Sequence, residues 1–179
     1  EQLLRKSLEV LDRLGESWLR VAFYHHLRHV YSVQGHSDKE LAAAEIENQI
    51  GEAAGDPCTI CWGQYGMADA KARMGRLPEA HEHMRRSFEA IQGRRSTISE
   101  SVALNHYGFV LLQSSDYAKA YEVLGESRKV FERGFCYLEY VARTYTWQME
   151  SLIGPEWTKP RRDGDIRRAK RLSIKARFF

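Results

Sequence analysis

Apolar residues recur every three or four positions along most of the chain. The stretches SWLRVAFYHHLRHVYSV (17–33), EAHEHMRRSFEAI (79–91) and SVALNHYGFVLL (101–112) show this spacing, which is typical of amphipathic helices. No sustained apolar/polar alternation and no Asn-Gly or Asp-Gly hairpin signal is present. The pattern therefore predicts an all-α fold.

The breaks between the predicted helices share a form and a spacing. The stretch 75–80 (GRLPEA) recurs as 115–120 (SDYAKA), and more loosely as 35–42 (GHSDKELA), so successive breaks are 40 residues apart (75 − 35 and 115 − 75). A glycine just past a helix end provides the left-handed residue of a C-cap. Ser37 to Glu40 and Thr97 to Glu100 fit capping boxes, and Asp56-Pro57 fits a helix start. A period in this range with two helices per unit indicates a helical solenoid.

These joints and the small residues around them resemble the tetratricopeptide repeat (TPR) family. In the copy at 104–131 the matching positions are Gly108, Ser115, Ala120, Leu124 and Ser127. In the copy before it they are Ala68, Gly75, Leu77, Ala80, Met84 and Ser87. The first copy departs from the pattern, since Arg28 replaces a small residue. The resemblance implies a right-handed superhelical array of antiparallel helix hairpins, of a long-period type similar to the arrays of bacterial regulators.

The period sets the expected organisation of a single domain over 1–179. We expect 1–15 to be the second helix of a preceding repeat, followed by hairpins at 16–55, 56–95, 96–134 and 135–179. Glu1 lies in the body of an amphipathic helix without a signal-peptide layout, so we expect a piece of a longer protein. No apolar run approaches about 18 residues, which predicts no membrane span. Three cysteines cannot all pair, and we expect a reduced, cytoplasmic setting.

Charge is unevenly distributed, although hydrophobic (43%) and charged (28%) fractions are ordinary. Residues 159–179 carry nine basic and two acidic side chains, a net of +7, which leaves −4 over 1–158 for a total of +3. This basic tail could contact nucleic acid. We favour a second helix of the last repeat with solvated charges, and expect neither membrane nor nucleic-acid binding. The apolar residues Phe178 and Phe179 are compatible with self-association through the ends of the array.

Chemical motifs are sparse. Cys58 and Cys61 form a CxxC at a predicted helix start, but a redox pair or zinc site lacks the surrounding strand or further ligands. His25 and His29 share a helix face without an evident third ligand. Phosphate-binding glycine motifs and a GxSxG nucleophile motif are missing from the sequence. We expect no enzyme activity, cofactor or metal, although redox activity of the cysteines and metal binding by the histidines stay open.

Residues 40 apart occupy equivalent positions in successive first helices and form columns across the array. One column, with Phe23, Gly63, Ala103 and Arg143, is mostly apolar and is predicted to pack. The opposite columns occupy positions that line the concave groove in the TPR family. The predicted groove residues are His25, His29, Trp62, Tyr65, Asp69, Asn105, Phe109, Tyr145 and Met149. The alternative is that these residues fill the interior of the superhelix.

The resulting hypothesis is a non-enzymatic interaction module whose groove binds a protein or peptide segment. We expect it to be the regulatory part of a larger signalling or transcription-regulating protein. One alternative is an effector-sensing domain that binds a small ligand in an ATPase- or cyclase-coupled regulator. The second alternative is nucleic-acid contact through the basic C-terminal helix.

Overall fold

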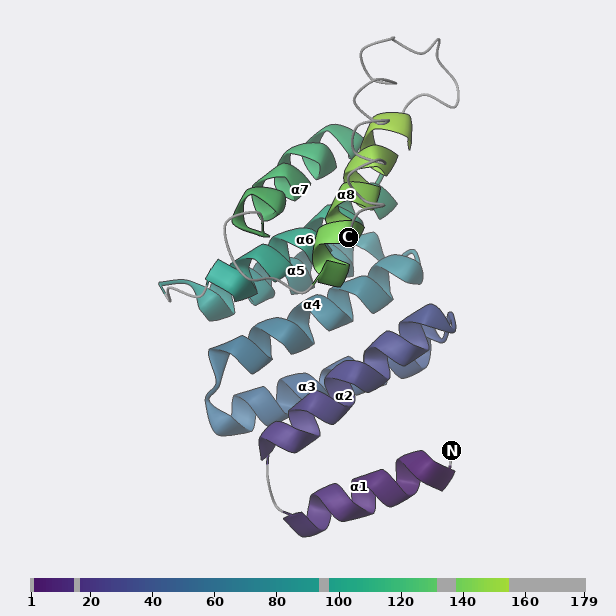
Figure 1. Ribbon diagram of the computed structural model, residues 1–179, viewed down its shortest axis with the longest axis vertical. Helices are drawn as coiled ribbons and strands as arrows, with labels where there is room; N and C mark the ends of the chain where they lie inside the picture. Colours follow the sequence, from purple (N-terminus) through teal and green to yellow (C-terminus); the bar gives the residue numbers. More distant parts are fainter. Residues whose placement is uncertain (1, 15–16, 94–96, 132–137, 155–179) are drawn as a thin grey trace.

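The structure is a computed structural model, and it describes residues 2–14, 17–93, 97–131 and 138–154 (Figure 1). These residues form eight α-helices and no strand. The helices are α1 (Gln2–Leu14), α2 (Ser17–Val33), α3 (Ser37–Ala54), α4 (Pro57–Arg73), α5 (Leu77–Ile91), α6 (Thr97–Gln113), α7 (Tyr117–Phe131) and α8 (Leu138–Ile153).

The helices pack as sequential antiparallel pairs. The pairs α2/α3, α4/α5 and α6/α7 are stacked along the long axis, α8 packs on α6 and α7, and α1 forms the opposite end (Figure 1). Within the stack the first helix of each pair contacts the first helix of the next, α2 with α4 and α4 with α6. The predicted all-α array of helix hairpins is confirmed.

Each joint within a hairpin has the same backbone geometry. Gly35, Gly75 and Ser115 adopt positive φ values of 73°, 74° and 60°. At the first joint the N–H of Gly35 donates to Ser32 O and that of His36 to Tyr31 O, and the same pair of bonds recurs 40 and 80 residues later. This is a Schellman C-cap, which satisfies helix-end carbonyls with the next two N–H groups. Ser115 shows that the position tolerates a serine in the left-handed conformation.

The two predicted helix starts that the structure describes differ in outcome. Asp56 caps α4 as expected, because its carboxylate accepts from the N–H groups of Cys58 and Thr59. The capping box at Ser37 is wrong: α3 begins with His36 as N-cap and shows no side-chain cap. Glu40, its predicted partner, instead accepts a 2.7 Å bond from Arg73 Nη1 and is buried. The side chain of Thr97 lies outside the described residues.

Glycines allow α3 and α4 to pack at short range. A Cβ added to Gly63 would lie 2.6 Å from Asn48 Cα, and one added to Gly51 would lie 2.7 Å from Ile60 N. Backbone therefore packs against backbone at the α3–α4 interface. Gly108 in α6 is also closely packed, but a Cβ added there would meet the side chain of Leu124 in α7. The close interface fixes α4 in the middle of the stack, where most of its residues are buried.

Several expectations fall outside the described residues. They concern the basic stretch from Lys159, the second helix of the hairpin 135–179 and the apolar end at Phe178-Phe179. The described helices α2 to α7 fall within the predicted segments 16–55, 56–95 and 96–134. No helix of the described part is long and apolar enough to cross a bilayer.

The glycine contact between α3 and α4 gives a stability prediction. Gly63→Ala forces a methyl group onto the α3 backbone, and we expect it to lower the unfolding free energy by about 1–3 kcal/mol in urea titrations. Gly125→Ala is the matched control, because it lies inside α7 and its added Cβ meets only the flexible end of Gln148 at 3.2 Å. There the gain in helix propensity offsets the contact. Equal stabilities of the two variants would refute the close-packing account.

Candidate functional site

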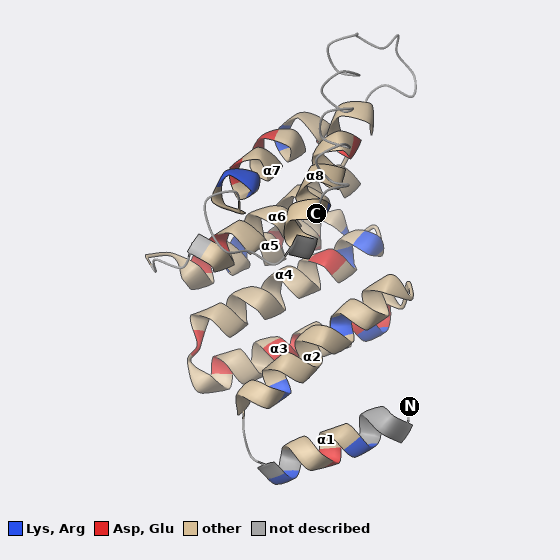
Figure 2. Ribbon diagram, viewed as in Figure 1, with Lys and Arg blue, Asp and Glu red and all other residues tan. Residues whose placement is uncertain are grey.

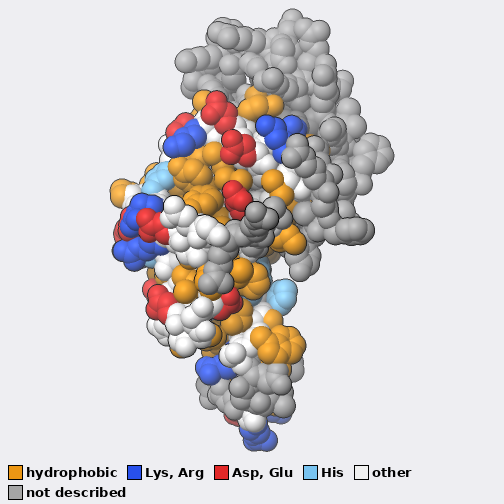
Figure 3. Space-filling view, turned by 90° about the vertical axis from the view of Figure 1, so that its left-hand side faces the viewer, with side chains coloured by type: hydrophobic (Ala, Val, Ile, Leu, Met, Phe, Trp, Pro, Cys, Tyr) orange, Lys and Arg blue, Asp and Glu red, His pale blue; other side chains and the backbone are white. Residues whose placement is uncertain are grey.

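A cavity of about 940 Å³ is lined by described residues of α2, α3, α4, α6 and α8. Its walls are mainly aromatic and aliphatic, with several imidazoles among them. Figure 3 shows hydrophobic side chains on the side of the molecule where α2, α4 and α6 begin. The lining residues are Ser17, Trp18, Val21, Ala22, His25, His26, His29, Val33, Ile50, Ala54, Asp56, Thr59, Trp62, Tyr65, Ile98, Ser99, Val102, Tyr140 and Arg143.

Exposed apolar side chains concentrate at this cavity. Five large hydrophobic residues of the described chain are exposed, and three of them line it: Trp18 (63%), Val33 (90%) and Ile98 (51%). Single exposed apolar residues need no explanation, but a contiguous group around a concavity marks an interaction site. The cavity therefore carries an apolar surface that a ligand could cover.

The structure brings four of the nine predicted groove residues to this cavity. His25, His29, Trp62 and Tyr65 line it, although only a small edge of Tyr65 is accessible. The other five lie elsewhere, so the predicted columns are not exposed along their whole length. Asp69, Asn105, Phe109 and Tyr145 are buried, and Met149 is half-buried against the core. For these residues the alternative of an interior position holds.

A buried ion pair anchors the histidine wall to α3. Arg28 Nε donates to Glu47 Oε2 at 3.1 Å, and both side chains are almost fully buried. The other carboxylate oxygen of Glu47 lies 2.8 Å from His25 Nδ1. Glu47 therefore holds one cavity-lining imidazole and one interior cation at once, and it fixes how α2 sits on α3.

Tyr65 connects this ion pair to the next helix of the stack. The Arg28 guanidinium lies 4.8 Å from the centre of the Tyr65 ring, an attractive cation–π contact. On its other side, Tyr65 stacks on His106 with ring centres 4.0 Å apart. His106 Nδ1 in turn lies 2.7 Å from Asp69 Oδ2. A continuous layer of polar and aromatic groups thus joins α2, α4 and α6 at the cavity wall.

Arg143 corrects the assignment of its column. The sequence placed it on the packing face, but it lines the cavity, and its Nε donates to Asn105 Oδ1 at 3.0 Å. Its guanidinium also lies over the rings of Tyr140 (4.3 Å) and Trp147 (5.0 Å). Asn105, predicted to contact a partner, donates instead to Thr144 Oγ1 at 2.6 Å.

Two of the cavity-lining histidines, His25 and His29, are uncharged at neutral pH. Burial lowers the pKa of His25, against the hydrogen bond to Glu47. Burial and the nearby charge of Arg28 lower the pKa of His29 to about 2. The carboxylate of Asp56 is engaged by the N–H groups of its own helix. The site therefore offers an apolar surface, neutral imidazoles and the guanidinium of Arg143.

Sequence analysis missed Trp18, Ile98 and Tyr140 in this site. Trp18 and Ile98 are two periods apart (98 − 18 = 80), and each lies one helical turn before another lining residue, Ala22 or Val102. An apolar column at the helix starts was therefore present in the sequence. For Tyr140 we find no comparable periodic signal.

The described residues do not support the chemical motifs. They include no group of three or more His, Cys, Asp or Glu side chains that could hold a metal ion. Cys61 is buried, its Sγ lies 3.2 Å from Ser87 Oγ, and burial raises its pKa to about 11. Cys58 is half-buried beside Ser99, whose Oγ lies 3.7 Å from its Sγ. The thiol of Cys61 is therefore held in its unreactive, protonated form.

Comparison with known proteins identifies a fold but no close relative. No protein-family model matches the chain, and no curated protein matches its sequence. Among solved structures it is similar to the crystal structure of BtubC (BKLC) from P. vanneervenii, with a TM-score of 0.67 and 15% identity. The match covers 99% of this chain and 70% of that one. At this identity the likeness shows the fold alone, an all-α, TPR-like array of helix pairs.

The ion pair beneath the cavity yields a stability prediction. Glu47→Leu leaves the Arg28 guanidinium buried without a counter-charge, and we expect a loss of about 3–5 kcal/mol in unfolding free energy. The double variant Arg28→Met with Glu47→Leu removes both charges and should recover most of that loss. Chemical denaturation of the two variants measures the difference. If the double variant were no more stable than the single one, the buried charge would not be the cause.

Burial of His106 predicts a pH dependence of stability. Burial, opposed by Asp69, lowers the pKa of His106 to about 4, against a usual value of 6.5. Between these values the unfolded chain binds the proton and the folded chain does not, so stability falls as pH drops from 6.5 to 4. The contribution amounts to about 3 kcal/mol. Urea titrations across this range should show the loss, and His106→Gln combined with Asp69→Asn should flatten it by that amount. An unchanged slope would contradict the assignment.

Proposed function

We propose that this chain is a non-enzymatic interaction module that binds a segment of a partner protein in the cavity between α2, α4, α6 and α8. The concentration of exposed apolar side chains around the cavity supports the proposal most directly. Trp18, Val33 and Ile98 would be covered by a bound segment, and burial of such anchors dominates the energy of peptide recognition. The TPR-like fold agrees with this use.

The extent of the cavity favours a chain segment as the ligand. Its lining runs along α2 from Trp18 to Val33, 15 residues or about 22 Å of helix. An extended peptide of about seven residues spans that length. Imidazoles of His25, His26 and His29 lie along the same path and can hydrogen-bond peptide groups. The hydrogen bond to Glu47 holds the imidazole of His25 in place, which lowers the entropic cost of binding at this residue.

A small apolar effector is a second candidate. A volume of about 940 Å³ is within the range of small-molecule sites, which are usually apolar with a few polar groups. Such a ligand would fill part of the cavity and would not need Trp18 and Val33 together. The further hypotheses that this chain is part of a signalling or transcription-regulating protein, or of an ATPase- or cyclase-coupled regulator, rest on the resemblance of its repeats to the TPR family.

A displayed library of random linear peptides tests the proposal. We expect selection on the purified protein to enrich peptides with aromatic or aliphatic anchors. Trp18→Ala and Ile98→Ala should each weaken their binding about tenfold or more, as measured by fluorescence anisotropy. Both residues are exposed, so these changes should leave the melting temperature nearly unaltered.

Val30→Ala is the matched control for these variants. Val30 is also an exposed apolar residue of α2 but does not line the cavity, so binding should be unaffected. Peptides that bind equally well to the Trp18 and Ile98 variants would rule out the cavity as the site. Binding of small apolar compounds that depends on Trp62 but not on Trp18 would favour the effector alternative.

A further inference from the structure

One positively charged side chain lines the cavity between α2 and α8. Among the lining residues, Asp56 and Arg143 are the two with Asp, Glu, Lys or Arg side chains. The Asp56 carboxylate accepts hydrogen bonds from the N–H groups of Cys58 and Thr59 and from the Thr59 hydroxyl at 2.5 Å. The positive end of the α4 dipole further offsets its charge. Arg143 on α8 therefore sets the charge that a ligand meets in the cavity.

Neutral groups hold the guanidinium of Arg143. Its Nε donates to Asn105 Oδ1 at 3.0 Å, and its Nη2 lies 3.4 Å from His106 Nε2. The rings of Tyr140 and Trp147 lie 4.3 and 5.0 Å from it. Burial lowers the pKa of His106 to about 4, so this imidazole is uncharged at neutral pH and can accept the bond from Nη2. These contacts fix the orientation of the guanidinium but do not neutralise its charge.

Arg143 differs in this respect from the arginine buried beneath the same cavity wall. Arg28 has an ionic partner, Glu47, at 3.1 Å. Among the described side chains, no carboxylate forms an ion pair with Arg143, and Asp69 approaches it only through the ring of His106. The charge of Arg143 is therefore compensated by water in the open cavity.

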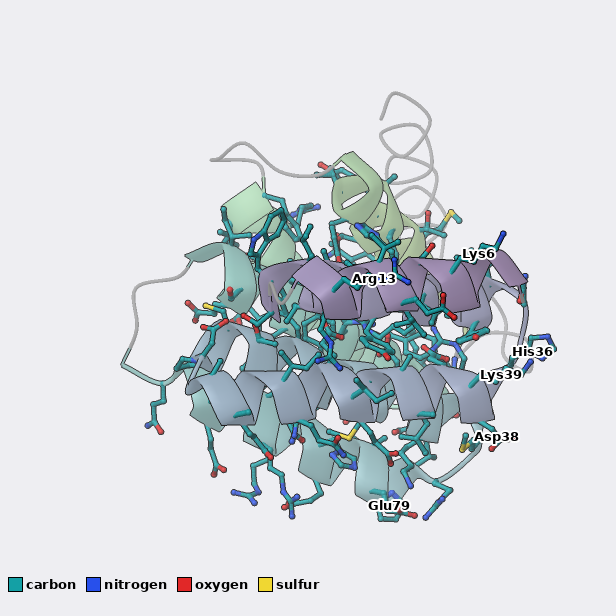
Figure 4. The ribbon with its side chains drawn as sticks, turned by 90° about the horizontal axis from the view of Figure 1, so that it is seen from below. Lys6, Arg13, His36, Asp38, Lys39 and Glu79 are labelled. Atoms are coloured by element: carbon teal, nitrogen blue, oxygen red, sulfur yellow. The ribbon has the colours of Figure 1, made fainter. Side chains whose placement is uncertain are left out.

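The helices around Arg143 carry few other charges. The segment 57–68 of α4 has no Asp, Glu, Lys or Arg, and α6 has only Glu100, which is exposed (Figure 2). Charged side chains such as Lys39 and Glu79 lie instead on the outer surface (Figure 4). An anionic group that enters the cavity thus meets one cation and little competing charge.

A ligand that fills the cavity would leave this cation without solvent. A bound apolar segment covers the walls and displaces water from the Arg143 guanidinium. Removing water from a charge is costly unless an ionic partner replaces it. A carboxylate provides two oxygens in the geometry of the guanidinium edge. A segment with an acidic group at this point would therefore bind more tightly than one without it.

We propose that Arg143 is a specificity-determining residue that pairs with an Asp or Glu side chain of the bound segment. The proposal rests on the proposed function and adds to it the charge of the ligand. The ion pair lies at the α8 wall, whereas Trp18 lies on α2. The acidic residue and the apolar residue that covers Trp18 are therefore different parts of the segment.

Paired peptides test the proposal. Peptides from the display selection are synthesised with a C-terminal amide, in pairs that differ only by Glu or Asp against Gln or Asn. In fluorescence anisotropy we expect the acidic member to bind the wild-type protein about tenfold more tightly. Arg143→Gln should reduce this preference to less than about twofold. Arg143→Lys keeps the charge but loses the planar pair of donors, so it should retain an intermediate preference.

Lys129→Gln is the matched control, because it removes a charge of the same sign from an exposed position of α7 outside the cavity. It should leave the preference unchanged, and circular dichroism with melting temperatures verifies that every variant is folded. Selected peptides without acidic residues, or an acidic preference that survives Arg143→Gln, would overturn the role of Arg143 even where binding still depends on Trp18. Peptides indifferent to Trp18→Ala would refute the cavity as the site, and this proposal with it.

Discussion

The contact of the Arg28 guanidinium with Tyr65, and of Tyr65 with His106, is the interaction on which the rest of the stack depends. It places a charged group, a phenol ring and a neutral imidazole from three successive first helices in one line. Burying these groups is costly unless each is paired. Glu47 pairs with Arg28 within the α2/α3 hairpin, and Asp69 of α4 pairs with His106 of α6. The second pair holds two neighbouring hairpins in their relative positions. An apolar interface would permit sliding more easily than this arrangement does.

The layer of paired polar and aromatic groups also restrains side chains of the cavity wall. His25 is held by Glu47 from behind, and Tyr65 and Arg143 each contact the polar layer on one side and the cavity on the other. The exposed apolar residues Trp18 and Ile98 line the same cavity. The site thus combines a fixed floor with an apolar rim, an arrangement that suits recognition by shape and burial more than by charge.

Local features could be predicted from the sequence, whereas features set by distant contacts could not. The joint at Gly75 and the cap at Asp56 follow from interactions within a few residues, and both were predicted. Glu40 does not take its expected capping role, because its carboxylate accepts a hydrogen bond from Arg73, 33 residues away (73 − 40). Asn105 is buried through its hydrogen bonds to Thr144 and Arg143 of α8, and a period of residues does not encode such contacts between helices. The period therefore gave the level of each groove residue but not its exposure.

The identical joints at Gly35, Gly75 and Ser115 also bear on how such a chain can change in length. These joints are 40 residues apart (75 − 35 and 115 − 75) and share one backbone geometry. Insertion or deletion of one 40-residue hairpin therefore connects the chain at structurally equivalent positions. Any other length would rotate the following helix by about 100° per residue and turn its buried face outward. Length variation among homologous chains is thus expected in whole hairpins, with each added hairpin extending the wall of the cavity by one helix.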